Sequence, residues 1–208
     1  MIRVLSQRSF ERAVTTLCER DERLARIVAQ WGPPPFWTHP IGFPGITLAI
    51  LAQQVSLESA QAAFRKLERT IHTVTPAAFL TLDAAALRAV GFSRQKASYV
   101  RGIALNIDAG DIDFDSLRRL SDDAVRARLQ QLRGVGRWTA DTYLLFALRR
   151  ADVWPRGDLA LEIAVAELAG APARLAEDAV DRIVRAWAPL RAVAARILWC
   201  HYLKQRGR

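Results

Sequence analysis

Apolar residues recur at steps of three and four over most of the chain. Between residues 9 and 30, for example, Phe10, Val14, Leu17 and Leu24 fall near one face of a helix. Ser, Thr or Asp precedes many such segments, as at helix starts, and no segment shows the alternation of a strand. The pattern therefore predicts an all-α protein with about ten short helices. The candidate helix caps are Ser56, Thr75, Asp83, Ser93 and Ser121.

Prolines interrupt the helical pattern over residues 33–44. Phe36, Trp37 and Phe43 lie in this stretch and can pack, so we expect an ordered crossover loop rather than a flexible linker. Farther on, the segment 143–148 is apolar on every side. Such a segment is typical of a central, buried helix.

Composition restricts the class of protein. The chain has 208 residues, of which 51% are apolar, so it can form one compact domain or two small lobes. No apolar run is long enough to span a bilayer, and the first residues are too polar for a signal peptide, so we expect a cytoplasmic protein without a membrane partner. Cys18 and Cys200 lack metal-ligand spacing, and they are too few for a four-cysteine iron–sulfur cluster.

The formal net charge of +9 favours a polyanionic partner, and nucleic acid is the first candidate. A second explanation stays open because nearly all the basic residues are Arg. Lys occurs only at Lys66, Lys96 and Lys204, and a GC-rich genome can produce that bias. Charge alone does not decide between the two.

Residues 132–140 read L-R-G-V-G-R-W-T-A and lie between two helical patterns. Gly134 and Gly136 flank one apolar residue, Val135, which can pack between the two helices. We expect both glycines to allow a tight turn and to leave the N–H groups at the start of the second helix uncovered. Uncovered N–H groups at a helix start bind phosphate. An ordinary helix–turn–helix corner is the alternative.

Asp158 follows the hairpin in the segment W-P-R-G-D, residues 154–158. Taken locally, Asp158 caps the helix that begins after it, and the local pattern alone favours this role. A carboxylate can also stabilise a sugar with oxocarbenium character or orient a water molecule, as hydrolysis of a glycosidic bond requires.

The string L-x-G-V-G-x-x-T-A resembles the helix-hairpin-helix motif of a superfamily of DNA glycosylases, in which an essential Asp stands at the place of Asp158. Residues 50–56 and 91–97 resemble the I-L-x-Q-Q-x-S and G-h-s-x-x-K-A segments (h, apolar; s, small) of its 3-methyladenine DNA glycosylase II branch. The order and spacing of the four segments agree over residues 44–203.

The resemblance implies an all-α fold of two helical lobes with a DNA-binding cleft between them. Lobe A is expected to contain residues 1–43 and 151–208, and lobe B residues 44–150, with the helix-hairpin-helix at about 121–149. The best-known member carries an extra N-terminal β-domain. This chain looks like a compact form without that domain.

The activity implied is hydrolysis of the N-glycosidic bond of alkylated bases, such as 3-methyladenine and 7-methylguanine, flipped out of double-stranded DNA. This step starts base excision repair. Asp158 is the implied catalytic residue, and a positively charged base leaves with little acid assistance. Bifunctional members use a hairpin Lys to form a Schiff base. Trp138 stands there instead, so no AP-lyase activity is expected.

Further roles follow from the resemblance by position. Gln54 stands where a wedge fills the gap left by the flipped base, although the best-known member has an apolar residue there. Trp138 and Trp199 are expected to line the base pocket, because an indole face attracts a cationic purine. Core packing is the alternative for both. Thr142 replaces a pocket aromatic of one relative, so that wall is missing or wider.

Contacts with the DNA backbone are expected from these residues: Arg133, Gly134, Val135, Gly136, Arg137, Thr139 and Lys96. The resemblance also implies a monovalent cation, Na⁺ or K⁺, held by the backbone carbonyls of Gln130, Leu132 and Val135. No other cofactor is expected. A monomer suffices for the implied reaction. Because the expected partner is double-stranded DNA, we expect the protein at the nucleoid.

Other functions stay open. An enzyme of the same superfamily could excise another lesion. The missing Lys argues against a bifunctional glycosylase for 8-oxoguanine, and the missing cysteine cluster makes a glycosylase for adenine mispairs less favoured. A non-catalytic DNA-binding or damage-sensing module is disfavoured by the acid at Asp158. A metal-dependent nuclease has little support, because no carboxylate cluster follows a nuclease pattern.

Overall fold

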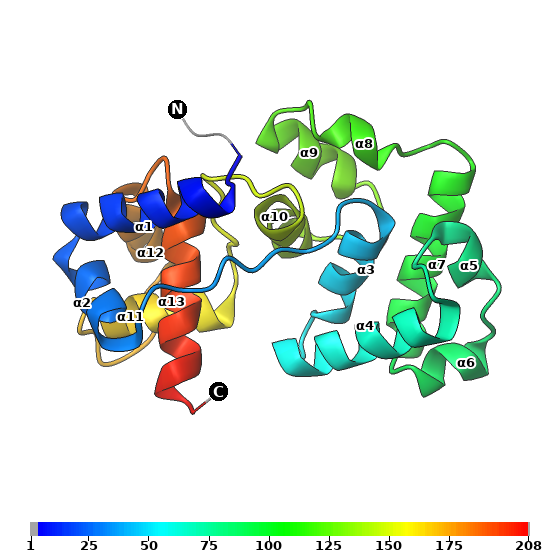
Figure 1. The fold of residues 1–208 in the computed structure, drawn as a ribbon, viewed down its shortest axis with the longest axis horizontal. Coiled ribbons are helices and arrows are strands. Elements are labelled where there is room, and N and C mark those ends of the chain that lie inside the picture. Colours follow the sequence, from blue (N-terminus) through cyan, green and yellow to red (C-terminus); the bar gives the residue numbers. More distant parts are fainter. Residues whose placement is uncertain (1–3, 208) are drawn as a thin grey trace. The chain divides into compact units, whose positions relative to one another are not determined.

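The computed structural model describes residues 4–207 (Figure 1). These residues form thirteen α-helices and no strand, with one isolated antiparallel bridge between Val4 and Arg150. The all-α prediction is confirmed. More helices are found than the expected number of about ten, because the single helix expected over residues 9–30 divides at Asp21 into α1 and α2, and because α8 is too short to show a periodic apolar pattern.

The helices are α1 (Gln7–Arg20), α2 (Glu22–Trp31), α3 (Phe43–Leu51), α4 (Leu57–Ile71), α5 (Pro76–Leu80), α6 (Ala84–Ala89), α7 (Arg94–Asp108), α8 (Phe114–Leu117), α9 (Asp122–Leu129), α10 (Arg137–Phe146), α11 (Leu159–Leu168), α12 (Glu177–Arg185) and α13 (Arg191–Gln205). Within residues 4–207, no helix is long and apolar enough to cross a membrane.

The chain divides into two compact units. Unit 1 comprises Met1–Thr38 and Arg149–Arg208, and unit 2 comprises His39–Leu148. Unit 1 therefore holds α1, α2, α11, α12 and α13, and unit 2 holds α3 to α10. The hairpin segment belongs to unit 2, and Asp158 belongs to unit 1.

Helix α13 lies at the centre of unit 1, where it contacts α1, α2 and α11 (Figure 1). Most of its residues are buried, including the charged Arg196. The Arg196 guanidinium lies over the rings of Phe10 and Phe36. It donates hydrogen bonds to the carbonyls of Ala192 and Trp37 at 3.0 and 3.2 Å, and burial lowers its pKa to about 9. Arg196 thereby fixes the start of the proline-rich stretch to α13.

Helix α10 belongs to unit 2, where it contacts α3 and α9. Every residue from Thr139 to Leu145 is buried, which confirms the prediction of a buried helix. The Tyr143 hydroxyl accepts a hydrogen bond from the Gly42 N–H at 2.9 Å, and burial raises the pKa of Tyr143 to about 12. His39 stacks on Phe146 with ring centroids 4.6 Å apart. This core holds the helix whose first residues complete the hairpin.

Candidate functional site

The hairpin joins α9 to α10 through residues 130–136. Gly134 has a φ of +87°, in the left-handed region that favours glycine. A Cβ atom at this position would lie 2.2 Å from the ring of Tyr99 on α7. Val135 is buried, as expected of the apolar pin, and its N–H donates to the Leu132 carbonyl at 3.1 Å. Both the backbone and the packing therefore require glycine at position 134.

Gly136 differs from Gly134. Its φ and ψ of −86° and −178° are open to any residue, and a Cβ atom there would meet nothing within 4 Å. The turn therefore requires glycine at position 134, whereas at position 136 its backbone only allows it. Gly136 is the N-cap of α10 and has no side chain, so it leaves the start of the helix without a side-chain cap. Such a helix start can bind a phosphate.

Gln53 connects the hairpin to the turn between α3 and α4. Its Nε2 donates hydrogen bonds to the Gly134 carbonyl and to Thr139 Oγ1, both at 2.9 Å. The Lys96 ammonium donates to the carbonyls of Gln53 and Leu51, at 2.8 and 2.7 Å. This role of Gln53 was not predicted, although the Q-Q pair of the I-L-x-Q-Q-x-S segment was a signal for it.

Thr139 and Lys96, both expected at the DNA backbone, already have partners in unit 2. Thr139 is buried, and its hydroxyl accepts a hydrogen bond from Gln53. Lys96 gives two of the three N–H groups of an ammonium to carbonyls, and desolvation lowers its pKa. Contacts of these two residues with DNA stay predictions. They would use the backbone N–H of Thr139 and the third N–H of Lys96.

A groove of about 560 Å³ lies beside the hairpin, and its described lining includes Gln54, Arg133 and Gly136 but no acidic residue. Gln54 is exposed and has a φ of +55°, a left-handed conformation that is uncommon outside glycine. Backbone strain of this kind costs about 1–3 kcal/mol and concentrates at functional sites. The conformation makes Gln54 a candidate functional residue, and its role as the wedge stays a prediction.

Asp158 is the N-cap of α11 in unit 1. Its Oδ1 accepts hydrogen bonds from the Leu161 N–H at 3.0 Å and from the Trp199 indole N–H at 3.1 Å. The local cap is confirmed. The bond from Trp199 was not predicted, and it joins two residues that were expected at the site for other reasons. One local donor and one tertiary donor thus fix the carboxylate.

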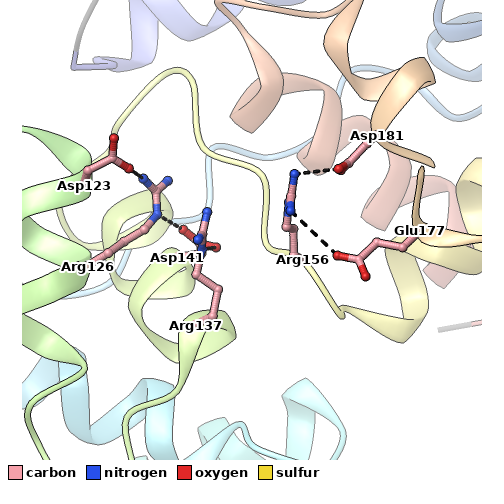
Figure 2. Close-up of polar contacts among 7 residues, drawn as sticks. All are labelled: Asp123, Arg126, Arg137, Asp141, Arg156, Glu177 and Asp181. Atoms are coloured by element: carbon pink, nitrogen blue, oxygen red, sulfur yellow. Dashed lines mark hydrogen bonds and ion pairs between the residues drawn. The ribbon is translucent and has the colours of Figure 1, made fainter. Parts of the chain in front are cut away.

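An arginine holds the loop that precedes Asp158 (Figure 2). Arg156 donates a hydrogen bond to Asp181 of α12 at 2.6 Å, and its Nη1 lies 3.8 Å from Glu177 Oε1. Trp154, at the other end of the loop, is buried. Two anchors within unit 1 therefore hold the segment that carries Asp158, and neither anchor was predicted from the sequence.

The hairpin and the acidic helix cap belong to a chain that matches a known family. The model for HhH-GPD superfamily base excision DNA repair proteins matches residues 47–189, which is more than half of the chain. The chain belongs to this superfamily.

Relatives of this HhH-GPD protein include DNA-3-methyladenine glycosylase 1 of Schizosaccharomyces pombe, 29% identical over 200 residues that cover 94% of this chain and 88% of the relative. The solved structure of S. pombe 3-methyladenine DNA glycosylase Mag1 in complex with abasic DNA has a TM-score of 0.79 at 29% identity, covering 92% of this chain and 95% of that chain. A DNA-3-methyladenine glycosidase structure from Bacillus halodurans has a TM-score of 0.74 at 27% identity, covering 94% and 91%. The predicted superfamily is confirmed.

The remaining predicted pocket residues of this HhH-GPD protein lie on α10. Trp138 is half-buried in the first turn, and Thr142, one turn later, is buried. Within residues 4–207, Thr142 Oγ1 has no hydrogen-bond partner. Both residues belong to unit 2, whereas Trp199 belongs to unit 1. A shared base pocket stays a prediction.

The predicted cation ligands of the hairpin are backbone carbonyls, whose oxygen atoms can coordinate Na⁺ or K⁺. The Leu132 carbonyl already accepts the Val135 N–H, and a carbonyl oxygen has a second lone pair. The hairpin therefore fits such an ion, with Gln130, Leu132 and Val135 as donors, and the ion stays a prediction. Clusters of His, Cys, Asp or Glu able to hold a metal are not found in the described part of the chain.

Proposed function

We propose that this HhH-GPD protein is a monofunctional DNA-3-methyladenine glycosylase of type II. It removes 3-methyladenine, 7-methylguanine and similar bases from double-stranded DNA as a monomer and so starts base excision repair. One observation carries the proposal: Asp158 is fixed at the start of α11 by the Leu161 N–H and the Trp199 indole. The similarity to glycosylases of that name over most of the chain supports it.

The hairpin of unit 2 holds the DNA backbone. The uncapped N–H groups at the start of α10 bind a phosphate, and the helix dipole adds to the attraction. Arg133 and Arg137, both exposed, flank these N–H groups. Contacts of this kind do not depend on base sequence. The relative solved with abasic DNA supports DNA as the partner.

Asp158 acts on the sugar of the flipped nucleotide. As the N-glycosidic bond breaks, its electron pair passes to the cationic base, which leaves neutral, and the sugar gains oxocarbenium character. The carboxylate stabilises this charge and orients the attacking water. The water oxygen bonds to the sugar carbon, and its proton passes to the carboxylate. Trp138 and Trp199 supply indole faces that attract a cationic purine.

Strand cleavage needs an amine that this site does not offer. Trp138 occupies the position of the Schiff-base lysine, and an indole nitrogen is not a nucleophilic amine. Lys96 lines the groove beside the hairpin, but its ammonium donates to two carbonyls. The reaction therefore stops at the abasic site.

The proposal is tested by incubating the protein with DNA treated with a methylating agent. We expect free 3-methyladenine and 7-methylguanine, abasic sites that break only in alkali, and no protein–DNA adduct after borohydride reduction. Strands cut without alkali, together with a trapped adduct, would contradict the monofunctional mechanism and point to Lys96. Binding to DNA without release of any base would contradict the enzymatic role and favour a damage-sensing module.

A further inference from the structure

A buried carboxylate lies one turn into α10. Asp141 is fully buried, and it accepts hydrogen bonds from Arg126 Nε at 2.5 Å and from Arg137 Nε at 3.0 Å, one on each oxygen. Figure 2 shows Arg126 between Asp141 and Asp123, to which its Nη1 donates at 2.7 Å. The four residues form a charge network that connects α9 to the start of α10.

Arg137 stands where a cation does not stabilise its helix. It is the first residue of α10, whose first turn contains no acidic residue. The N-terminal end of a helix carries partial positive charge, so a cation there is unfavourable. By contrast, α9 begins with Asp122 and Asp123, the charge that this end favours. The helix dipole therefore gives no reason for a cation at position 137.

The network leaves Arg137 able to bind an anion. Its side chain is 49% exposed, whereas that of Arg126 is 12% exposed. Arg126 neutralises the buried Asp141, and Asp123 is 95% exposed, so water screens its charge. Within residues 4–207, the bond of Arg137 to Asp141 uses Nε. Both Nη groups then remain for a phosphate, which a guanidinium binds through two parallel hydrogen bonds.

We propose that Asp141 is a positioning residue for DNA binding. Its buried carboxylate holds the Arg137 guanidinium beside the uncapped start of α10, so that the guanidinium and the helix N–H groups bind one phosphate together. Arg126 supplies the positive charge that a buried carboxylate needs. Fixing the guanidinium in advance reduces the side-chain entropy lost on binding. The inference rests on the proposed function, because it assigns the start of α10 to DNA.

The proposal separates geometry from charge at position 137. A lysine there keeps the positive charge. Its ammonium is a point charge, however, and it cannot donate to Asp141 while also binding a phosphate through two parallel bonds. If Asp141 positions the guanidinium, a lysine at position 137 will not restore the affinity for DNA. If only the positive charge matters, a lysine will keep the affinity of the wild type.

The first experiment measures the affinity of the full chain for a duplex with a stable abasic-site analogue, over a salt series, for Arg137→Lys and Arg137→Gln. We expect both variants to bind about tenfold more weakly, with lysine recovering little of the loss. Arg69→Gln is the control, since Arg69 is exposed and forms no ion pair within the described residues. It should stay within about twofold of the wild type. Wild-type affinity in Arg137→Lys would overturn the proposal.

The second experiment is a double-mutant cycle that joins Asp141→Asn to Arg137→Gln. We expect Asp141→Asn to weaken binding about as much as Arg137→Gln, and to add nothing in the combined variant. Equal losses in both backgrounds would show that Asp141 only supports the fold and would overturn the proposal. Thermal melts report whether each variant folds. If Asp141→Asn does not fold, the comparison of lysine with glutamine at position 137 decides.

Base release by the wild-type protein is measured separately from these affinities. A protein that binds the duplex but releases no base would contradict the proposed enzyme activity while leaving the cycle readable. A protein that fails to bind the duplex would contradict both.

Discussion

The helix starts of α10 and α11 differ in both cap and charge. Helix α10 begins after Gly136, without a side-chain cap and with Arg137 as its first residue. Helix α11 begins after Asp158, whose carboxylate caps the helix and accepts the Trp199 indole N–H. The first start presents uncovered N–H groups and a cation, and the second presents an anion. The first therefore suits a phosphate, and the second suits a cationic sugar.

In these two helices, the cap residue decides whether the N–H groups of the helix start stay open to a ligand. An aspartate at position 136 would occupy the N–H groups that we propose to bind phosphate. A glycine at position 158 would remove the acceptor of the Trp199 indole N–H. Because each start lies in its own compact unit, a substitution at one should leave the other intact.

A third helix start provides a matched control for Asp158. Asp21 caps α2 in unit 1, and its Oδ2 accepts the Trp187 indole N–H at 2.9 Å. Arg23 donates two side-chain hydrogen bonds to the same carboxylate, and this bonding lowers the pKa of Asp21 to about 2. Asp21 thus shares the cap and the indole donor with Asp158 but has no part in the proposed chemistry.

Asp158→Asn should give the largest change. Asn caps a helix about as well as Asp and can accept both hydrogen bonds, so the fold should persist. Loss of the charge should lower the single-turnover rate of base release by about 10²–10³-fold or more. Affinity for an abasic-analogue duplex, measured in parallel, should change little. Loss of binding together with activity would favour a purely structural cap.

Gly134→Ala should strongly weaken unit 2. The added methyl group meets the Tyr99 ring, and the left-handed backbone disfavours it. We expect the free energy of unfolding, measured by chemical denaturation, to fall by about 2–4 kcal/mol. Unchanged stability would show that the Tyr99 ring can move aside and that the hairpin does not need this glycine.

Gly136→Asp tests the open helix start by itself. The backbone allows aspartate there, and as a cap it should leave stability unchanged or raise it by a few tenths of a kcal/mol, roughly. The same side chain occupies the N–H groups and repels phosphate, so affinity should fall about tenfold or more for every DNA sequence alike. A loss confined to some sequences, or none, would contradict phosphate binding at this start.

Asp21→Asn should give the smallest change in activity. Base release should equal that of the wild type, while stability near neutral pH falls by about 2 kcal/mol. A carboxylate whose pKa is lowered by folding stabilises the protein above its unfolded pKa, and that contribution is lost as the pH falls toward the folded value of about 2. The stabilities of variant and wild type should therefore approach each other as the pH falls from about 4 to about 2. An equal loss of base release would remove the distinction between Asp21 and Asp158.

Local sequence patterns predicted much of the fold, because helix starts and buried faces depend on neighbouring residues. All five predicted caps are observed: Ser56, Thr75, Asp83, Ser93 and Ser121. The buried α10 and the cap at Asp158 were predicted in the same way. The roles of the site residues toward DNA stay predictions.

Local sequence patterns did not predict the tertiary hydrogen bonds. Gln53 lies 81 residues from Gly134 in the sequence, and Asp158 lies 41 residues from Trp199. No local periodicity pairs residues at such separations. For the same reason, Lys96 was expected only at the DNA backbone, whereas packing of α7 against α3 brings it to two backbone carbonyls.

Separation of binding at α10 from chemistry at α11 is the central claim. It is tested most directly by measuring 3-methyladenine release and duplex affinity side by side for Gly136→Asp and Asp158→Asn. We predict that Gly136→Asp binds weakly yet releases base at a near wild-type rate once DNA is saturating. Asp158→Asn should bind normally and release almost none. Loss of both properties in both variants would contradict the claim.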